Sequence, residues 1–472
     1  MKHVRYFSKG LLLISVCFAV EACSNDDFID LEQNKTQVES TTHTIAMEFI
    51  GNLAGFDHQS NDVKVQTRAT SSSWTNGDKI YITFYNGSNI VPGEATYNSS
   101  SGWSVSYDGI LGTGSNLKCE ARYFVNTTFS SSSLVSLNPN TEIYEDLNGT
   151  YTYNNGSLTV QASLTPKTGR IRFTGTSGAK IYTTGISVYT TFSPAINQFS
   201  TSNAMITSTV ASNGSTPYIY GTFSDSDRNI GLIGSDFAYT RTCTSDMLKV
   251  GESGYMVIPS ENSHNNWRSG LCVKASGVEF KMIPVAGYTG GFYLIGETEV
   301  TEALYKTVNG NSSSSQLPIS NISYSGAIAF IEKLNNYTNL NFAIPSEAQW
   351  MYASKGGSKT QNYTYAGSNT PGDVAWYSAN CSSKQNVKTK APNELGIYDM
   401  SGNVGEFVSD VYSSSYPDHH KVYGGSYKSS IDYITKTSYA YYAGNSSKYT
   451  SSGYSDLIYD LGIGFRVILT CP

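Results

Sequence analysis

The stretch PNELGIYDMSGNVGE at residues 392–406 decides the fold of the C-terminal part, together with GGS at 424–426 and GFR at 464–466. Helical patterns appear in the chain only around these motifs, after about residue 268. Between residues 325 and 335, one side of a helix would carry Ile328, Phe330, Ile331 and Leu334. This spacing predicts an amphipathic helix whose apolar stripe faces a core.

Two shorter helices are predicted from their end signals. Ser346 is a good N-cap residue, and Gln349 three residues later completes a capping box. Gly356 would end that helix. Another helix is expected from Thr301 to Val308, with short strands around all three. The pattern predicts a separate α+β domain at residues 269–472.

The residues before this domain show short strands broken by Gly, Asn and Ser, and no long helical periodicity. Clear strand patterns occur at residues 45–50, 79–84 and 170–173. Tyr and Thr favour strands, whereas Gly and Asn favour turns. We therefore predict two β-sandwiches, at residues 41–145 and 146–268.

Composition narrows the possible partners. The chain has 472 residues, which is too long for one hydrophobic core. Charged residues make up 14%, the formal charge is −6, and no basic run occurs. Nucleic acid is therefore not an expected partner, because phosphate binding needs clustered Lys and Arg.

The N-terminus has the pattern of an export signal. A basic segment precedes an apolar run at residues 11–20 that is too short to span a bilayer. The residues before Cys23 resemble a lipobox, and the acidic residues after it resemble the export tag of Bacteroidetes surface lipoproteins. We predict a signal peptide at 1–22, lipidation of Cys23 and a tether at 23–40, which would anchor the protein on the outer membrane surface. The alternative is an ordinary secretory signal with a chance cysteine.

Two stretches of the first half resemble the fimbrillin family of Bacteroidetes pilins. They are residues 67–80, with Thr67-Arg68-Ala69-Thr70 and WTNGDKI, and LTPKTGRIRF at 164–173. The resemblance covers about residues 41–268 and implies transthyretin-like sandwiches. It also implies cleavage after Arg68 and replacement of the lost strand by one from another pilin subunit. The alternative is that Arg68 is only an exposed linker residue.

The C-terminal motifs resemble the formylglycine-generating-enzyme, or sulfatase-modifying-factor, family. Besides the motifs given above, they include VEFKMIPV at 278–285, ETEVT at 297–301 and PSEAQW at 345–350. The resemblance implies a C-type-lectin-like fold. The family's enzymes use a cysteine pair shortly after GGS, but this chain has no cysteine between Cys381 and Cys471. We therefore expect neither copper nor formylglycine formation, and we identify no catalytic residues.

The same family resemblance implies a calcium ion and a disulfide. The matching calcium ligands would be the side chains of Asp399 and Glu406 and the carbonyl groups of Gly402 and Val404, a hard oxygen set that suits Ca²⁺. The alternative is two solvated carboxylates near a turn. Because the two ends of this fold meet, the expected disulfide joins Cys272 and Cys471.

The last fifty residues are rich in Tyr, with Ser, Asn and Gly between them. Tyr provides a large contact area at low entropic cost, as in antibody paratopes. Retroelement-diversified lectin-fold proteins carry variable residues at the same place, which implies that this segment could be diversified. The alternative is a surface that is merely Tyr-rich, like the whole chain. The predicted ligand-binding residues are Tyr427, Tyr433, Tyr439, Tyr441, Tyr442, Tyr449 and Tyr454.

Together these features predict a lipid-anchored pilin with a lectin-like terminal domain. It would act as a pilus-tip adhesin that binds a glycan or protein ligand. The alternative function is an accessory factor or enzyme of sulfated-glycan or sulfatase metabolism, against which the missing cysteine pair argues. A structural surface protein without a specific ligand is the third possibility.

Overall fold

The structure is a computed structural model. It describes residues 42–53, 57–58, 74–125, 127, 133–244, 247–259, 266–434, 439–444 and 462–471. In these ranges, no helix combines the length and the apolar character needed to cross a membrane. The predicted signal peptide, Cys23, the tether at 23–40 and Arg68 lie outside the described residues.

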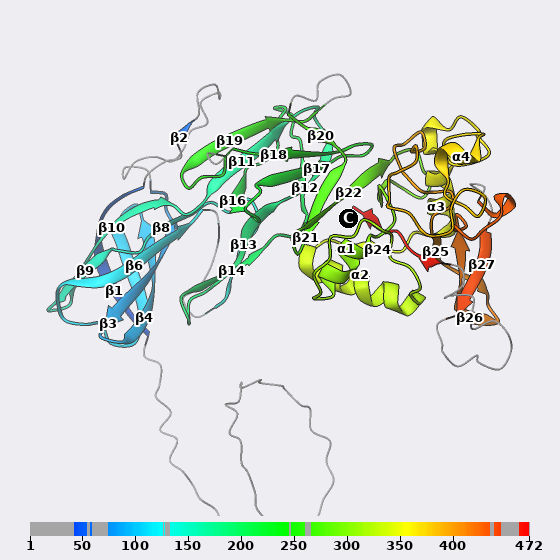
Figure 1. Cartoon of the computed structure of the whole chain (residues 1–472). Helices are drawn as coiled ribbons and strands as arrows, with labels where there is room; N and C mark the ends of the chain where they lie inside the picture. The colour runs from blue at the N-terminus through cyan, green and yellow to red at the C-terminus, as the bar shows by residue number, and fades with distance from the viewer. Residues whose placement is uncertain are drawn as a thin grey trace, which may run out of the picture. The chain divides into compact units, whose positions relative to one another are not determined.

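An eight-stranded sheet forms the first β-rich region, drawn in blue to cyan in Figure 1. The pairing closes on itself, because β1 pairs with β5 on one side and with β10 on the other. This differs from the two separate sheets of the predicted sandwich. In spatial order the strands are β1 (Thr42–Leu53), β5 (Gly102–Asp108), β4 (Asn89–Asn98), β3 (Lys79–Asn86), β6 (Gly114–Phe124), β8 (Ile143–Asp146), β10 (Ser157–Pro166) and β9 (Thr150–Asn154).

The boundary between the two β-rich regions lies later in the sequence than predicted, because the hairpin of β9 and β10 belongs to the first region. The prediction placed it between residues 145 and 146, but β10 pairs with β1, and both strands of the hairpin belong to the first sheet. Alternate residues of β10, such as Leu158 and Val160, are buried in the first core. An Asn155-Gly156 turn with positive φ at both residues joins the strands. The hairpin therefore buries its apolar face as one unit, and the first region extends to Pro166.

The second β-rich region consists of two sheets that share a core. Ile171 and Ile219 from one sheet and Ile181 and Leu232 from the other belong to the same buried cluster. One sheet has the order β14 (Gln198–Ser202), β13 (Ile186–Ser193), β16 (Ile219–Phe223), β11 (Gly169–Thr174), β19 (Glu252–Val257) and β2 (Asp57–His58), with β7 (Val135–Ser136) on β13. The other is β15 (Ile206–Thr209), β12 (Lys180–Thr184), β17 (Asn229–Ile233), β18 (Ala238–Thr242) and β20 (Arg268–Ser269).

The C-terminal domain contains two further sheets. The larger has the order β21 (Leu271–Ala275), β22 (Val278–Val285), β23 (Tyr293–Gly296), β29 (Ile468–Thr470) and β24 (Phe342–Ala343). The smaller is β27 (Tyr439–Gly444), β26 (Tyr416–Tyr423), β25 (Gly405–Ser413) and β28 (Ile463–Gly464). The last described strand of the chain thus lies inside the larger sheet.

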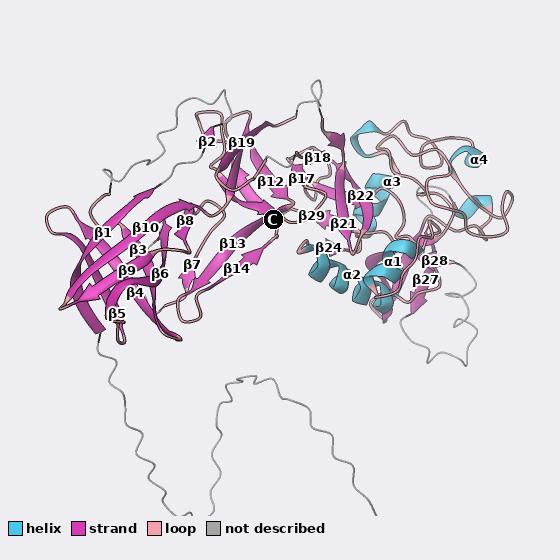
Figure 2. Cartoon of the chain, turned by 60° about the vertical axis from the view of Figure 1, so that its left-hand side comes forward, coloured by secondary structure: helices cyan, strands magenta, loops and turns pink. Residues whose placement is uncertain are grey.

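All described helices belong to the C-terminal domain (Figure 2). The three predicted helices are confirmed as α1 (Glu302–Val308), α2 (Tyr324–Thr338) and α3 (Glu347–Ser354). In α2, Phe330, Ile331 and Leu334 are buried, and in α3 both halves of the Ser346–Gln349 capping box are present. A further short helix, α4 (Pro371–Val374), has Pro at its first turn.

The predicted disulfide is wrong, because Cys272 and Cys471 are both free thiols. Cys272 lies on β21, and Cys471 directly follows β29. Two strands, β22 and β23, separate β21 from β29. Neighbouring strands lie about 4.8 Å apart, so these positions are well beyond the reach of a disulfide. The first and last strands of the domain, β21 and β29, therefore belong to one sheet but are not neighbours in it.

Candidate functional site

A buried ion pair between Arg466 and Glu406 lies at the centre of the C-terminal domain. Both side chains are completely buried. Nε of Arg466 lies 2.9 Å from Oε2 of Glu406, and Nη2 lies 2.7 Å from Oε1. The indole N–H of Trp350 also donates to Oε2, at 2.6 Å. Two parallel charge-assisted bonds of this kind fix both the distance and the orientation of the pair.

The same guanidinium group also binds two backbone carbonyl groups. It donates to the oxygen of Gly296 at 2.8 Å and to that of Tyr398 at 2.9 Å. Gly296 ends β23, whereas Tyr398 belongs to the loop before β25. Arg466 therefore ties the larger sheet, the smaller sheet and the intervening loop together. A buried charge is tolerated here because its donors find acceptors.

Two more buried carboxyl groups, Glu299 and Asp399, lie near this pair. Oε1 of Glu299 accepts from the Val404 N–H at 3.4 Å, and Oδ2 of Asp399 accepts from the Lys388 N–H at 2.8 Å. Their other carboxyl oxygens are buried without a hydrogen-bond partner. Burial raises the pKa of Asp399 to about 6. Burial, together with the charges of Asp399 and Glu406, raises the pKa of Glu299 well above its ordinary value.

The predicted calcium ligands fit a cation only in part. Asp399 has a buried oxygen that is free to coordinate. Glu406, in contrast, already accepts hydrogen bonds on both oxygens from Arg466 and Trp350. Within the described ranges, no group of three or more His, Cys, Asp or Glu side chains is placed to hold a metal ion. Asp399 is therefore the side chain on which the calcium prediction rests, with backbone carbonyl groups as the remaining ligands.

The structure places only some of the predicted tyrosines. Tyr433 is 46% exposed and Tyr427 is half-buried. Tyr439, Tyr441 and Tyr442 belong to β27, the outermost strand of the smaller sheet, which pairs with β26 (Figure 1). The other two predicted positions, Tyr449 and Tyr454, lie outside the described residues.

Not every tyrosine of the last fifty residues belongs to a surface. Tyr423 is buried, and its hydroxyl group hydrogen bonds to the carboxylate of Glu347. The prediction did not include Tyr423 among the ligand-binding residues. The tyrosines of this region therefore occupy two kinds of position. Tyr423 forms an internal hydrogen bond, whereas three others belong to β27.

The segment after GGS is held by serine hydroxyl groups. Ser426 and Ser429 are buried, and the backbone N–H of Ser426 donates to Oγ of Ser429 at 2.9 Å. The thiol of Cys381 donates to the Tyr377 carbonyl oxygen at 3.5 Å. The chain has no cysteine between Cys381 and Cys471. The segment that follows GGS therefore carries buried hydroxyl groups and no thiol.

Sequence reasoning missed two members of the buried network of charged side chains around Glu406. Glu299 and Arg466 were noticed only as letters of the ETEVT and GFR motifs. The available signal was a charged residue within an otherwise apolar strand pattern, since a charge at such a position needs a buried partner. The partner itself could not be chosen, because Glu406 precedes Arg466 by 60 residues.

A comparison with protein families assigns the C-terminal part of the chain. Residues 252–470 match the family described as the sulfatase-modifying factor enzyme 1-like domain. This region is a sulfatase-modifying-factor-like domain. Its match begins within β19, slightly before the expected boundary at residue 269. Among curated proteins, "Chaperone protein LppX" of Paenibacillus barcinonensis is 41% identical over 90 residues, which are 15% of this chain and 32% of that protein. The chain thus spans about a third of the length of this curated relative.

Several solved structures are similar to parts of the chain. Treponema denticola variable protein 1 is 24% identical, with 42% of this chain and 98% of that chain covered and a TM-score of 0.36. PvdO from Pseudomonas aeruginosa is 15% identical, with 43% and 99% covered and a TM-score of 0.32. A fimbrial protein from Bacteroides ovatus is 11% identical, with 90% and 99% covered and a TM-score of 0.25.

We expect Arg466→Met to destabilise the sulfatase-modifying-factor-like domain by about 3–5 kcal/mol, because Glu406 would remain buried without its cation. Urea denaturation of the whole chain, followed by the fluorescence of Trp350 and the other tryptophans, measures the loss. Lys306→Met is the control. It removes an exposed ion pair with Glu302 and should cost less than about 1 kcal/mol. Equal stability of the two variants would contradict the central position of Arg466.

The calcium prediction is tested by Asp399→Asn, which removes a charge but keeps the size of the side chain. We expect calcium to raise the melting temperature of the unaltered chain by about 2–4 °C, as for 1 kcal/mol of added stability. A chelator should abolish the increase, and Asp399→Asn should show none. Asp373→Asn, in the short helix α4, is the control that should keep it. The same increase in both variants would argue against an ion at Asp399.

Proposed function

We propose that this protein is a surface-anchored pilin that accepts a strand from another subunit and presents its C-terminal domain as an adhesin. The observation that carries the proposal is the position of β1. This strand precedes Arg68, the predicted cleavage position, and fills a place between two other strands of the first sheet. Removal of the segment before Arg68 would leave that place open.

The hydrogen bonds of β1 show what its removal would expose. β1 pairs in antiparallel fashion with β5 over residues 42–47 and in parallel fashion with β10 over residues 47–53. Without β1, the facing edges of β5 and β10 would present unpaired N–H and C=O groups. Such edges accept an added strand through main-chain hydrogen bonds.

The side chains of β1 show what kind of strand fits there. Met47 and Leu53 are buried in the first core, and Ile45 and Phe49 are partly buried. A replacement strand therefore needs apolar residues at alternate positions. At Gly51, a Cβ atom would lie 1.9 Å from the Ala162 carbonyl oxygen, so this position requires glycine or a shift of the backbone.

The position of β29 supports a terminal place in a fibre. β29 pairs with β23 on one side and with β24 on the other. Leu469 is fully buried. Donating this strand to a neighbour would therefore dismantle the larger sheet of the C-terminal domain. A subunit that accepts a strand without donating β29 would occupy the tip of the fibre. The proposed route of the protein to the outer membrane surface is lipidation of Cys23.

The adhesin part of the proposal rests on β27 and its neighbours. Among the described strands, β27 is at the edge of its sheet, three of its six residues are Tyr, and the exposed Tyr433 lies close to it in sequence. Tyr-rich surfaces bind glycans and proteins with few flexible side chains to immobilise. Ser and Asn follow β27 in the sequence, and such residues supply adaptable hydrogen bonds in binding surfaces.

The strand-exchange part is tested by nicking the purified chain with a trypsin-like protease. We expect cleavage after Arg68 and release of the preceding segment under mild denaturant. The emptied chain should then bind a fluorescent peptide of residues 42–53, because the peptide restores the lost main-chain bonds. Fluorescence anisotropy measures binding.

Two controls accompany this experiment. With an arginine-specific protease, which does not cut after Lys64, Arg68→Gln should keep the preceding segment attached and the chain unable to bind the peptide. A peptide with Met47→Asp and Leu53→Asp should not bind the emptied chain, because both side chains would meet the apolar core. Strand exchange at β1 is refuted if the two peptides bind equally well or if the segment before Arg68 resists removal.

The adhesin part is tested by binding to glycan and protein arrays. A variant with Tyr439→Ala, Tyr441→Ala and Tyr442→Ala should lose affinity for each ligand found by about tenfold or more, since truncated aromatic anchors dominate binding energies. Tyr337→Ala, which alters an exposed Tyr on α2, is the matched control and should bind as before. Unchanged binding by the triple variant would remove β27 from the ligand-binding surface.

A further inference from the structure

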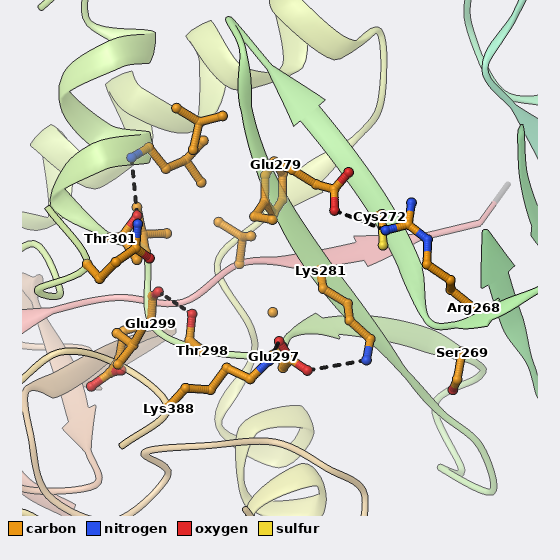
Figure 3. A pocket seen from close by; sticks show the side chains of 18 residues that line it. Arg268, Ser269, Cys272, Glu279, Lys281, Glu297, Thr298, Glu299, Thr301 and Lys388 are labelled. Carbon is orange, nitrogen blue, oxygen red and sulfur yellow. Dashed lines mark hydrogen bonds and ion pairs between the residues drawn. The ribbon is translucent and has the colours of Figure 1, made fainter. Parts of the chain in front are cut away.

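A cavity of about 370 Å³ lies beside the β21–β22 hairpin of the C-terminal domain (Figure 3). Its walls come from β20, β22, the segment between β23 and α1, and the loop that carries Lys388. A second cavity of about 350 Å³ shares Ser269, Lys281 and Glu297 with it. Small-molecule sites in proteins commonly have volumes of this order.

Positive charge exceeds negative charge around the mouth of this cavity. Lys281 and Lys388 both contact Glu297, with Nζ to carboxylate oxygen distances of 3.3 Å and 2.7 Å. Arg268 and Glu279 form a separate pair at 3.3 Å. Three cations therefore face two carboxylates. Each ammonium group has three N–H donors. Glu297 accepts from one donor of each group, so the other donors are available to a ligand.

Glu299 also borders the cavity but does not cancel this excess. Its side chain is 1% exposed, and one oxygen accepts from the backbone of Val404. Figure 3 shows the carboxyl group of Glu299 directed away from Lys281 and Glu297. The charges that a ligand would meet at the cavity mouth are thus those of Lys281, Lys388 and Glu297, with the paired Arg268 and Glu279 beside them.

The loop that carries Lys388 is held in an unusual conformation. Lys388 has φ of 66°, a left-handed backbone conformation that lysine seldom adopts. Two hydrogen bonds hold this part of the loop, from the Lys388 N–H to Asp399 and from the Val387 N–H to the Gln316 carbonyl oxygen at 2.9 Å. Strained positions that are held in this way occur most often at binding sites.

Glu297 is fixed as firmly as Lys388. Its backbone N–H donates to the Lys281 carbonyl oxygen at 2.8 Å. Its side chain is 12% exposed and lies between the two ammonium groups. The cationic pair is therefore preorganised, which lowers the entropic cost of binding an anion.

An apolar wall stands next to these charges. Val300, Leu304 and Val467 line the cavity and are buried, while Val278 and Phe280 line it from β22 and are partly buried. A ligand that fills the cavity would meet apolar surface on one side and ammonium groups on the other. Neither a bare inorganic anion nor an uncharged hydrocarbon uses both features.

We propose that this cavity binds a small acid, with one anionic group held by Lys281 and Lys388 and an apolar or ring-shaped body against Phe280. This site is separate from the tyrosines of β27 and from the strand position of β1. It gives the domain a small-molecule function that stands or fails independently of adhesion and fibre assembly.

Isothermal titration calorimetry on the whole chain tests the proposal with four probes: benzoate, phenyl sulfate, benzamide and inorganic sulfate. We expect benzoate or phenyl sulfate to bind at least about tenfold more tightly than benzamide, which lacks the charge, and than sulfate, which lacks the ring. The tighter of the two acids identifies the preferred anionic group, carboxylate or sulfate ester.

Lys281→Gln combined with Lys388→Gln should weaken binding of the preferred acid by about tenfold or more. Lys306→Gln, on the exposed side of α1, should bind it unchanged. Phe280→Ala should weaken binding of the aromatic acid but not of sulfate. Circular dichroism melting curves that match the unaltered chain establish that each variant is folded.

Three results would overturn the proposal. One is binding of both acids no tighter than that of benzamide, which would show that the ligand's charge is not recognised. Another is binding of inorganic sulfate as tight as that of the preferred acid, which would show that the apolar wall does not contribute. The last is the absence of binding of both acids at millimolar concentration.

Discussion

The bond between Arg466 and Glu406 is the constraint on which the C-terminal domain depends. Long connections separate elements of this domain, such as residues 375–404 between α4 and β25, and no named strand or helix lies within that connection. One guanidinium group joins Gly296, Tyr398 and Glu406, which belong to three different segments. A buried ion pair adds little net stability compared with apolar packing, but breaking one partner is costly. Its value here is to specify one arrangement of loops.

Local sequence signals predicted the local structure of this protein well. The capping box at Ser346 and Gln349 and the apolar stripe of α2 were readable because residues three or four apart meet on one helix. The strand patterns around residues 79–84 and 170–173 were readable for a similar reason, since alternate residues share one face of a strand. In each case the deciding contacts lie within a few residues.

The errors concern contacts between residues that are distant in the sequence. Cys272 and Cys471 were paired because the domain ends share a sheet, yet the strand order separates them. The boundary near residue 145 failed because β10 pairs with β1, more than a hundred residues earlier. The Lys281, Glu297 and Lys388 cluster escaped notice for the same reason, since Glu297 and Lys388 are 91 residues apart. Spacing and composition contain no information about which distant segments become neighbours.

The divided pairing of β1 has a consequence for any fibre that such a subunit joins. β1 pairs with β5 through residues 42–47 and with β10 through residues 47–53, so its two halves complete two different strands. A shorter replacement strand would leave N–H and C=O groups unpaired along one of the two edges. The neighbouring subunit would therefore have to supply an extended segment about as long as the 12 residues of β1.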